Sequence, residues 1–181
     1  MSVTVSSTAI NNLTVPSNTG TLLDTSNTTF FGADEWRLTT TITGTNADIT
    51  SNLERSDHSG AGYLGTGMTE SSGIFTFPNT GIWLVTVKNS TLFTAGDANA
   101  VVELNLTIDN SSYTEVAAAQ NGQESSGTAR QQAVGFAIID VTDVSLVKVK
   151  FATSSLGSGT SVEGSTSMNL TSFKFIRLGD T

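Results

Sequence analysis

The fold of this chain is decided by residues 73–87, GIFTFPNTGIWLVTV. Side chains alternate between the two faces of an extended segment, so Phe75 and Phe77 fall on one face. Pro78 ends the first extended segment because it has no N–H to donate to a sheet. Gly81 permits the backbone conformation from which the next segment starts. The stretch therefore predicts two β-strands joined by a Pro-Asn-Thr-Gly turn.

Period-two alternation of apolar residues continues outward from this stretch and predicts further strands. The segments that show it are 101–108, 134–139, 147–151 and 173–176. In segment 134–139 both alternating sets are apolar, which predicts a strand covered on both faces. Segment 115–120 is interpreted as an edge strand in preference to a helical turn. Turn-forming clusters between these runs give about eight to ten strands, typical of an antiparallel jelly-roll sandwich.

Composition limits the class of protein. The 181 residues contain no cysteine, which excludes disulfides and thiolate metal sites. The 8 basic and 16 acidic residues give a net charge of −8. Such a field repels phosphate backbones and anionic lipid, so we expect neither nucleic acid nor membrane as a partner. Residues 1–12 lack the basic and apolar regions of a signal peptide, and no apolar run is long enough to cross a bilayer.

Residues 1–32 differ from the rest of the chain. They are nearly uncharged and rich in Ser, Thr and Asn, and their apolar residues are isolated. Those candidate attachment residues are Val3, Val5, Ile10, Leu13 and Val15. Such a segment buries too little apolar surface to offset its chain entropy alone. We interpret it as an extended arm that becomes ordered on a neighbour, beside a domain at 33–181; the alternative is a terminus without a binding role.

Two motifs resemble a cofactor-binding loop and a catalytic site, but their sequence context supports neither. Gly60–Gly65 matches the G-x-G-x-x-G spacing of dinucleotide loops, yet polar residues precede it and no helix is predicted after it. His58 is the only histidine, and although Asp57 and serines are close in sequence, no Gly-x-Ser-x-Gly elbow is present. We therefore predict no catalytic residue, no cofactor-binding residue and no enzymatic activity.

Metal binding has no specific support either. Four carboxylates fall near predicted strand ends, where a hard cation such as calcium could be held: Asp97, Asp109, Asp140 and Asp143. No EF-hand spacing accompanies them, and a single histidine excludes a two-histidine zinc site. No metal and no cofactor are predicted.

Residues 73–83 also resemble a family motif. The globular heads of complement component 1q and the related tumour-necrosis-factor-like domains carry Gly-Ile-Phe-Thr-x-Pro-x-x-Gly-x-Tyr, and here only the tyrosine differs, replaced by Trp83. Residues 171–176 resemble the closing strand of that family, with Phe175 in place of the usual glycine. The resemblance covers about residues 35–178. It implies a ten-stranded jelly roll assembled as a tight homotrimer.

If the chain forms such a trimer, its aromatic residues belong either to the core or to the trimer seam. The candidates are Phe75, Phe77, Trp83, Phe173 and Phe175. Aromatic residues fill cores and interfaces more often than ligand sites, which is also the better interpretation of Trp36 against a sugar-stacking platform.

Cysteine-free domains of this type without a signal peptide resemble bacteriophage virion proteins. The leading hypothesis is a trimeric structural protein, either a capsid decoration (cement) protein or a head or tail appendage. It would be assembled in the host cytoplasm, located in the virion and attached to capsid or other virion proteins through its arm. The alternative is a receptor-binding or lectin-like module of a tail fibre that recognises a cell-surface glycan with loops 97–99 or 121–127.

Overall fold

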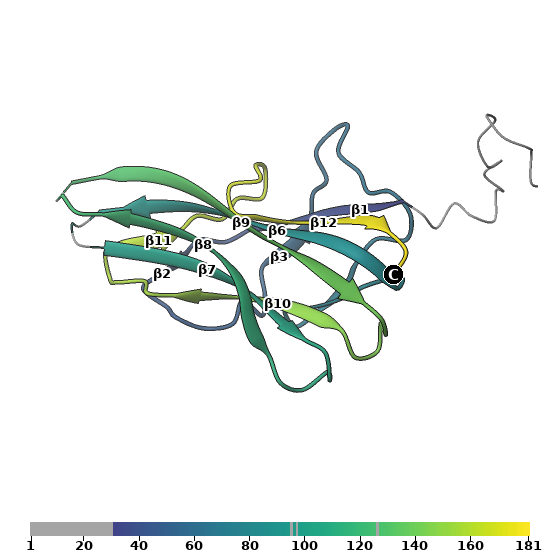
Figure 1. The fold of residues 1–181 in the computed structure, drawn as a ribbon. Coiled ribbons are helices and arrows are strands. Elements are labelled where there is room, and N and C mark those ends of the chain that lie inside the picture. The colour runs from purple at the N-terminus through teal and green to yellow at the C-terminus, as the bar shows by residue number, and fades with distance from the viewer. Residues whose placement is uncertain (1–30, 95, 97, 126) are drawn as a thin grey trace, which may run out of the picture.

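In the computed structural model, which describes residues 31–181 except 95, 97 and 126, two antiparallel β-sheets pack face to face (Figure 1). The strands in chain order are β1 (Gly32–Leu38), β2 (Ile42–Thr43), β3 (Leu53–Arg55), β4 (Thr69–Ser71), β5 (Ile74–Thr76), β6 (Gly81–Phe93), β7 (Ala98–Thr107), β8 (Thr114–Gln123), β9 (Ala129–Val141), β10 (Lys148–Ser154), β11 (Thr160–Val162) and β12 (Ser172–Gly179). The all-β jelly-roll prediction is confirmed. The strand number was underestimated, because β2, β3, β4 and β11 have only two or three residues and show no alternation.

The larger sheet has seven strands in the order β2-β11-β6-β12-β1-β3, and β9 pairs with the other side of β6. The smaller sheet has the order β4-β5-β10-β7-β8, so the prediction of an edge strand at 115–120 is confirmed. The two strands of the opening stretch, β5 and β6, lie in different sheets. The Pro-Asn-Thr-Gly turn therefore carries the chain from one layer to the other and does not make a hairpin. The described residues contain no helix, and thus none that could span a membrane.

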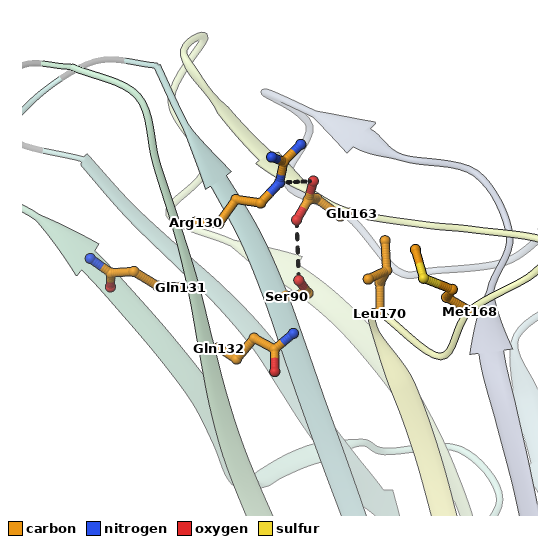
Figure 2. A pocket seen from close by; sticks show the side chains of 7 residues that line it. All are labelled: Ser90, Arg130, Gln131, Gln132, Glu163, Met168 and Leu170. Carbon is orange, nitrogen blue, oxygen red and sulfur yellow. Dashed lines mark hydrogen bonds and ion pairs between the residues drawn. The ribbon is translucent and has the colours of Figure 1, made fainter.

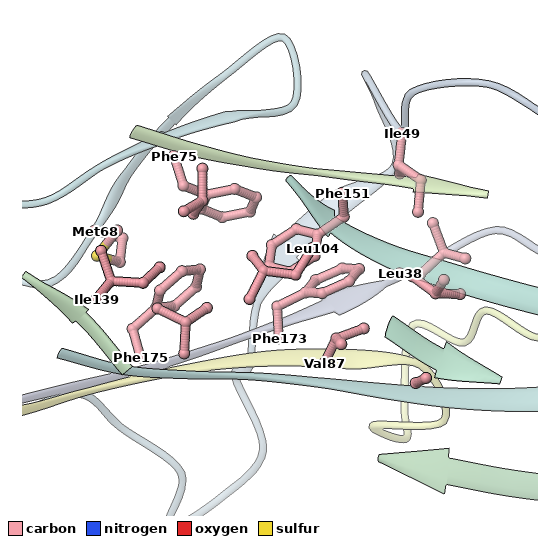
Figure 3. Packing of buried hydrophobic residues seen from close by; sticks show 14 of the residues in the cluster. Leu38, Ile49, Met68, Phe75, Val87, Leu104, Ile139, Phe151, Phe173 and Phe175 are labelled. Atoms are coloured by element: carbon pink, nitrogen blue, oxygen red, sulfur yellow. The ribbon is translucent and has the colours of Figure 1, made fainter. Parts of the chain in front are cut away.

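An aromatic cluster fills the space between the sheets (Figure 3). Phe75 lies at its centre, with ring centroids 5.4 Å from Trp36, 5.6 Å from Phe151 and 5.1 Å from Phe175. Phe151 stacks on Phe173 at 3.9 Å. The structure places all five candidate aromatic residues in this core, each with an exposed fraction of 1% or less. Rings with edge-to-face contacts add stability beyond the area that they bury.

The interior also contains a buried polar network. Asn89 on β6 donates from Nδ2 to the carbonyl oxygens of Ala100 on β7 (3.2 Å) and Ala119 on β8 (3.0 Å). Thr91 donates from Oγ1 to Asn89 Oδ1 (2.9 Å), and Asn121 Nδ2 donates to Thr91 Oγ1 (2.9 Å). We call Asn89, Thr91 and Asn121 the asparagine network. Because its members come from both sheets and are buried, it fixes the register of one sheet against the other.

Candidate functional site

The only histidine serves to hold a loop. Arg37 on β1 is completely buried, and its Nε and Nη2 donate to Glu54 Oε2 at 3.0 and 2.8 Å. The same guanidinium pairs with Asp57, and its Nη1 lies 3.2 Å from His58 Nε2. Burial works against the charge of Arg37, but the hydrogen bonds to Glu54 and Asp57 outweigh it and raise its pKa. Through this contact His58 links the loop between β3 and β4 to Arg37 on β1. Among the described residues, no hydrogen bond joins the His58 side chain to a serine.

The glycine-rich motif belongs to the same loop. Arg55 stacks between Trp36 and Tyr63, with its Cζ 4.8 and 4.6 Å from the two ring centroids. Its Nε also donates to Asp34 Oδ1 at 2.9 Å. The motif is followed by β4, without the helix whose N-terminus a dinucleotide loop requires. Trp36 contacts Phe75 edge-to-face and carries Arg55 over its ring, so its aromatic surface is used in packing.

Two of the predicted carboxylates, Asp109 and Asp143, close turns. Asp109 Oδ1 accepts from Ser112 N at 2.7 Å, Thr107 Oγ1 at 2.8 Å and Ser111 N at 2.9 Å. Asp143 Oδ1 accepts from the N and Oγ of Ser145, which lowers its pKa. Asp140 lies near the end of β9, and Asp97 lies outside the described residues. Among the side chains that the structure places, no group of three or more His, Cys, Asp or Glu could hold a metal ion.

Asp109 makes its turn sensitive to acid. Hydrogen bonds from Ser112, Thr107 and Ser111 lower its pKa from 3.8 to about 2. Because the folded pKa is depressed, the stabilisation is fully present above pH 3.8 and is lost as the pH falls through about 2. We expect an NMR titration of the Asp109 carboxyl carbon to have its midpoint near pH 2. A midpoint near 3.8 would contradict this prediction, and Asp109→Asn should keep the turn closed at all pH values.

An apolar row crosses the outer face of the seven-stranded sheet, the face turned away from the core. The strand registers place Ile138, Leu84, Ile176 and Ala33 side by side, and a β-bridge adds Leu64. These five residues are called the apolar row. Ile138, Leu64 and Ile176 have 65%, 54% and 40% of their surface exposed. Leu84 and Ala33 are partly exposed between them, so the row is continuous across several strands, unlike scattered surface apolar residues.

Two further side chains of β9 extend this surface. Val134 and Phe136 are 61% and 64% exposed and lie on the same face as Ile138. Leu178 of β12 is also exposed. The apolar row with Val134, Phe136 and Leu178 is called the association face. The prediction that segment 134–139 is covered on both faces is wrong for the isolated chain, because only its inner face is covered. Its outer face is apolar and stays exposed in the folded chain.

A groove of about 420 Å³ lies on the same side of the sheet, beside Arg130 and Gln132 of β9 (Figure 2). Its lining consists of Ser90, Arg130, Gln131, Gln132, Glu163, Met168 and Leu170. Glu163 is buried, and its two carboxylate oxygens accept from Arg130 Nε at 2.9 Å and from Ser90 Oγ at 3.1 Å. Met168 and Leu170 form an aliphatic wall beside this pair. Sequence reasoning missed this groove because it joins residues from β6, β9 and the segment after β11.

Of the residues in loops 97–99 and 121–127, which were predicted to bind a glycan, some lie at the surface and one is buried in the core. A depression of about 450 Å³ is lined by Ala98, Asn99, Gly122, Gln123 and Glu124. Asn121, however, is buried in the asparagine network and cannot contact a ligand.

Comparison with solved structures identifies the architecture. A tumour necrosis factor, Eiger from S. frugiperda, superposes with a TM-score of 0.62 at 14% identity, covering 84% of this chain and 95% of that one. The fold is a tumour-necrosis-factor-like jelly roll. Two crystal structures of murine APRIL also match, one at pH 5.0 with a TM-score of 0.56 and one at pH 8.5 with a TM-score of 0.54. Each match has 10% identity and covers 82% of this chain and 99% of that one. No protein-family model and no curated protein matches the sequence.

At such low identity the likeness concerns the fold alone. The TNF-like jelly roll confirms the architecture that residues 73–83 implied. The association face and the groove are both features of the outer side of its seven-stranded sheet.

Proposed function

We propose that the chain is a non-enzymatic structural protein that works as a homotrimer assembled through the association face. The observation that carries this proposal is the exposed apolar row with Phe136 and Val134 beside it. Burying a large apolar side chain contributes about 1.5–3 kcal/mol, so several of them can offset the cost of association. A threefold arrangement is supported by the TNF-like fold and by the motif at residues 73–83, and heterologous contacts can close a ring of three.

The site of action proposed for the trimer is the virion of a bacteriophage. The support comes from the sequence: a cysteine-free chain rich in Ser, Thr, Asn and Gly, with a nearly uncharged segment at residues 1–32. In this proposal the trimer decorates a capsid, or forms a head or tail appendage, and residues 1–32 contact a virion protein. Deleting residues 1–30 should abolish incorporation into particles while the folded domain remains. Unchanged incorporation would disprove the role of the arm.

The mass of the protein in solution tests the trimer directly. Light scattering coupled to gel filtration should give three chains of 18.8 kDa, about 56 kDa in all. The mass should be independent of salt concentration, because the proposed contact is apolar and is not screened. A monomeric mass at micromolar concentration would refute the proposal.

A second candidate function is recognition of a cell-surface glycan. The depression at Asn99 and Glu124 favours it, since amide and carboxylate groups are suitable partners for sugar hydroxyls. A glycan array probed with the protein and with an Asn99→Ala variant tests this function. Binding that Asn99→Ala abolishes would support it, and an array without any signal would exclude it for the glycans displayed.

A further inference from the structure

The groove on the outer face presents a cation beside an aliphatic wall. Arg130 is held at Nε by Glu163, yet its side chain is 69% exposed, so the remaining edge of the guanidinium faces solvent. Met168 is also largely exposed, and Leu170 is partly exposed next to it. Arginine binds carboxylates through paired, charge-assisted hydrogen bonds. The groove is therefore complementary to an aliphatic side chain followed by a carboxylate.

This chain contains such a segment outside the described residues. Asp24 is the only charged side chain in residues 1–32, and Leu22 and Leu23 precede it directly. We propose that residues 22–24 of one copy dock in the groove of a second copy. The leucines would contact Met168 and Leu170, and the carboxylate of Asp24 would pair with Arg130. This inference rests on the proposed function, because it requires copies to lie side by side.

The reach of the chain favours a second copy over the groove of the same copy. The path from Gly32 on β1 to Gln132 on β9 crosses three strand spacings and runs seven residues along the strand direction. The straight line between the two residues is therefore about 27 Å. The nine residues from Leu23 to Gly32 span at most about 30 Å when fully extended. A flexible chain of that length has an end-to-end distance of only about 17 Å. Docking within one copy would therefore need an almost straight segment.

Disulfide trapping in the full-length chain tests the contact, because the protein has no cysteine of its own. Thr25→Cys and Gln132→Cys would be combined, leaving Asp24 and Arg130 intact. A disulfide forms only where the two Cβ atoms come within about 3.5–4.5 Å. We expect oxidation to give covalent dimers and trimers on a non-reducing gel. The matched control combines Thr25→Cys with Thr69→Cys, an exposed position on the edge strand β4, and should stay monomeric on the gel.

Charge neutralisation adds a second readout. In the trapping background, Asp24→Asn and Arg130→Gln should each slow cross-linking about tenfold, and together they should slow it no further, because they remove the same contact. Equal cross-linking with the control pair, a cross-link within one chain, or no effect of Asp24→Asn would overturn the proposal. The solution mass of the reduced sample is measured in parallel by light scattering. A trimeric mass in a protein that gives no cross-links refutes the docking alone. A monomeric mass refutes the proposed function.

Discussion

Replacing Phe136 with glutamate is expected to convert the protein from a trimer of about 56 kDa to a monomer of 18.8 kDa. Phe136 lies in the middle of the exposed outer face of β9, between Val134 and Ile138. In the proposed assembly its ring is buried against a neighbouring copy, where an unpaired carboxylate would lose its hydration. The affinity should fall by more than about a hundredfold, as it does when a central interface aromatic is lost.

The same substitution should leave the folded chain almost unchanged, because the side chain faces solvent in the single copy. We expect a change in the free energy of unfolding of less than about 1 kcal/mol. Ile108→Glu is the matched control, since Ile108 is equally exposed but lies in the turn after β7. Light scattering should give a monomer for Phe136→Glu and a trimer for Ile108→Glu. A trimeric Phe136→Glu would exclude β9 from the interface.

Replacing Asn89 with leucine is expected to destabilise the folded chain by about 3–5 kcal/mol, although the two side chains have similar volumes. The amide of Asn89 donates to Ala100 and Ala119, and its oxygen accepts from Thr91. Leucine removes all three hydrogen bonds and leaves polar partners buried, at a cost of about 1–3 kcal/mol for each unsatisfied group.

Asn105→Leu provides the comparison for this prediction. Asn105 lies on β7, and its Nδ2 donates to Glu103 at a distance of 3.5 Å, a weak contact. Its replacement should cost less than about 1 kcal/mol. Urea unfolding of both variants at one protein concentration is the measurement, since association adds to the apparent stability. Equal midpoints for the two variants would show that the asparagine network does not support the packing of the two sheets.

Much of the fold could be predicted because its signals are local. Alternation in segments 101–108, 147–151 and 173–176 lies within β7, β10 and β12 or next to them. Pro78 and Gly81 marked the end of one strand and the start of the next. Which sheet each strand joins could not be predicted, because a turn has the same residues whether it makes a hairpin or crosses between layers. Strands of two or three residues carry no periodic signal at all.

The association face could not be predicted for a similar reason, because it depends on contacts between residues far apart in the sequence. Alternation around Phe136 revealed two apolar faces, but it could not tell that only one is covered within the chain. Leu64, Ala33 and Ile176 become neighbours through pairing registers that join distant parts of the sequence. Asn89 likewise reads as an ordinary polar residue in a strand, and only the packing of β6 against β7 and β8 shows why it is buried. The absence of enzymatic activity stays a prediction.

Gly135 has a consequence for how copies of this protein can meet. A Cβ atom at this position would lie 2.3 Å from the carbonyl oxygen of Ala118, so glycine allows β8, the edge strand of the smaller sheet, to pack closely against the inner face of β9, an edge strand of the larger sheet. An uncovered edge strand offers its N–H and C=O groups to strands of other molecules and can seed fibrils. Where the edge strands β8 and β9 of the two sheets pack this closely, we expect less room for an added strand, so that copies associate through side chains in a closed particle and do not form an endless β-ribbon. A bulkier residue at position 135 would push β8 away from β9, and we expect it to make the protein prone to aggregate.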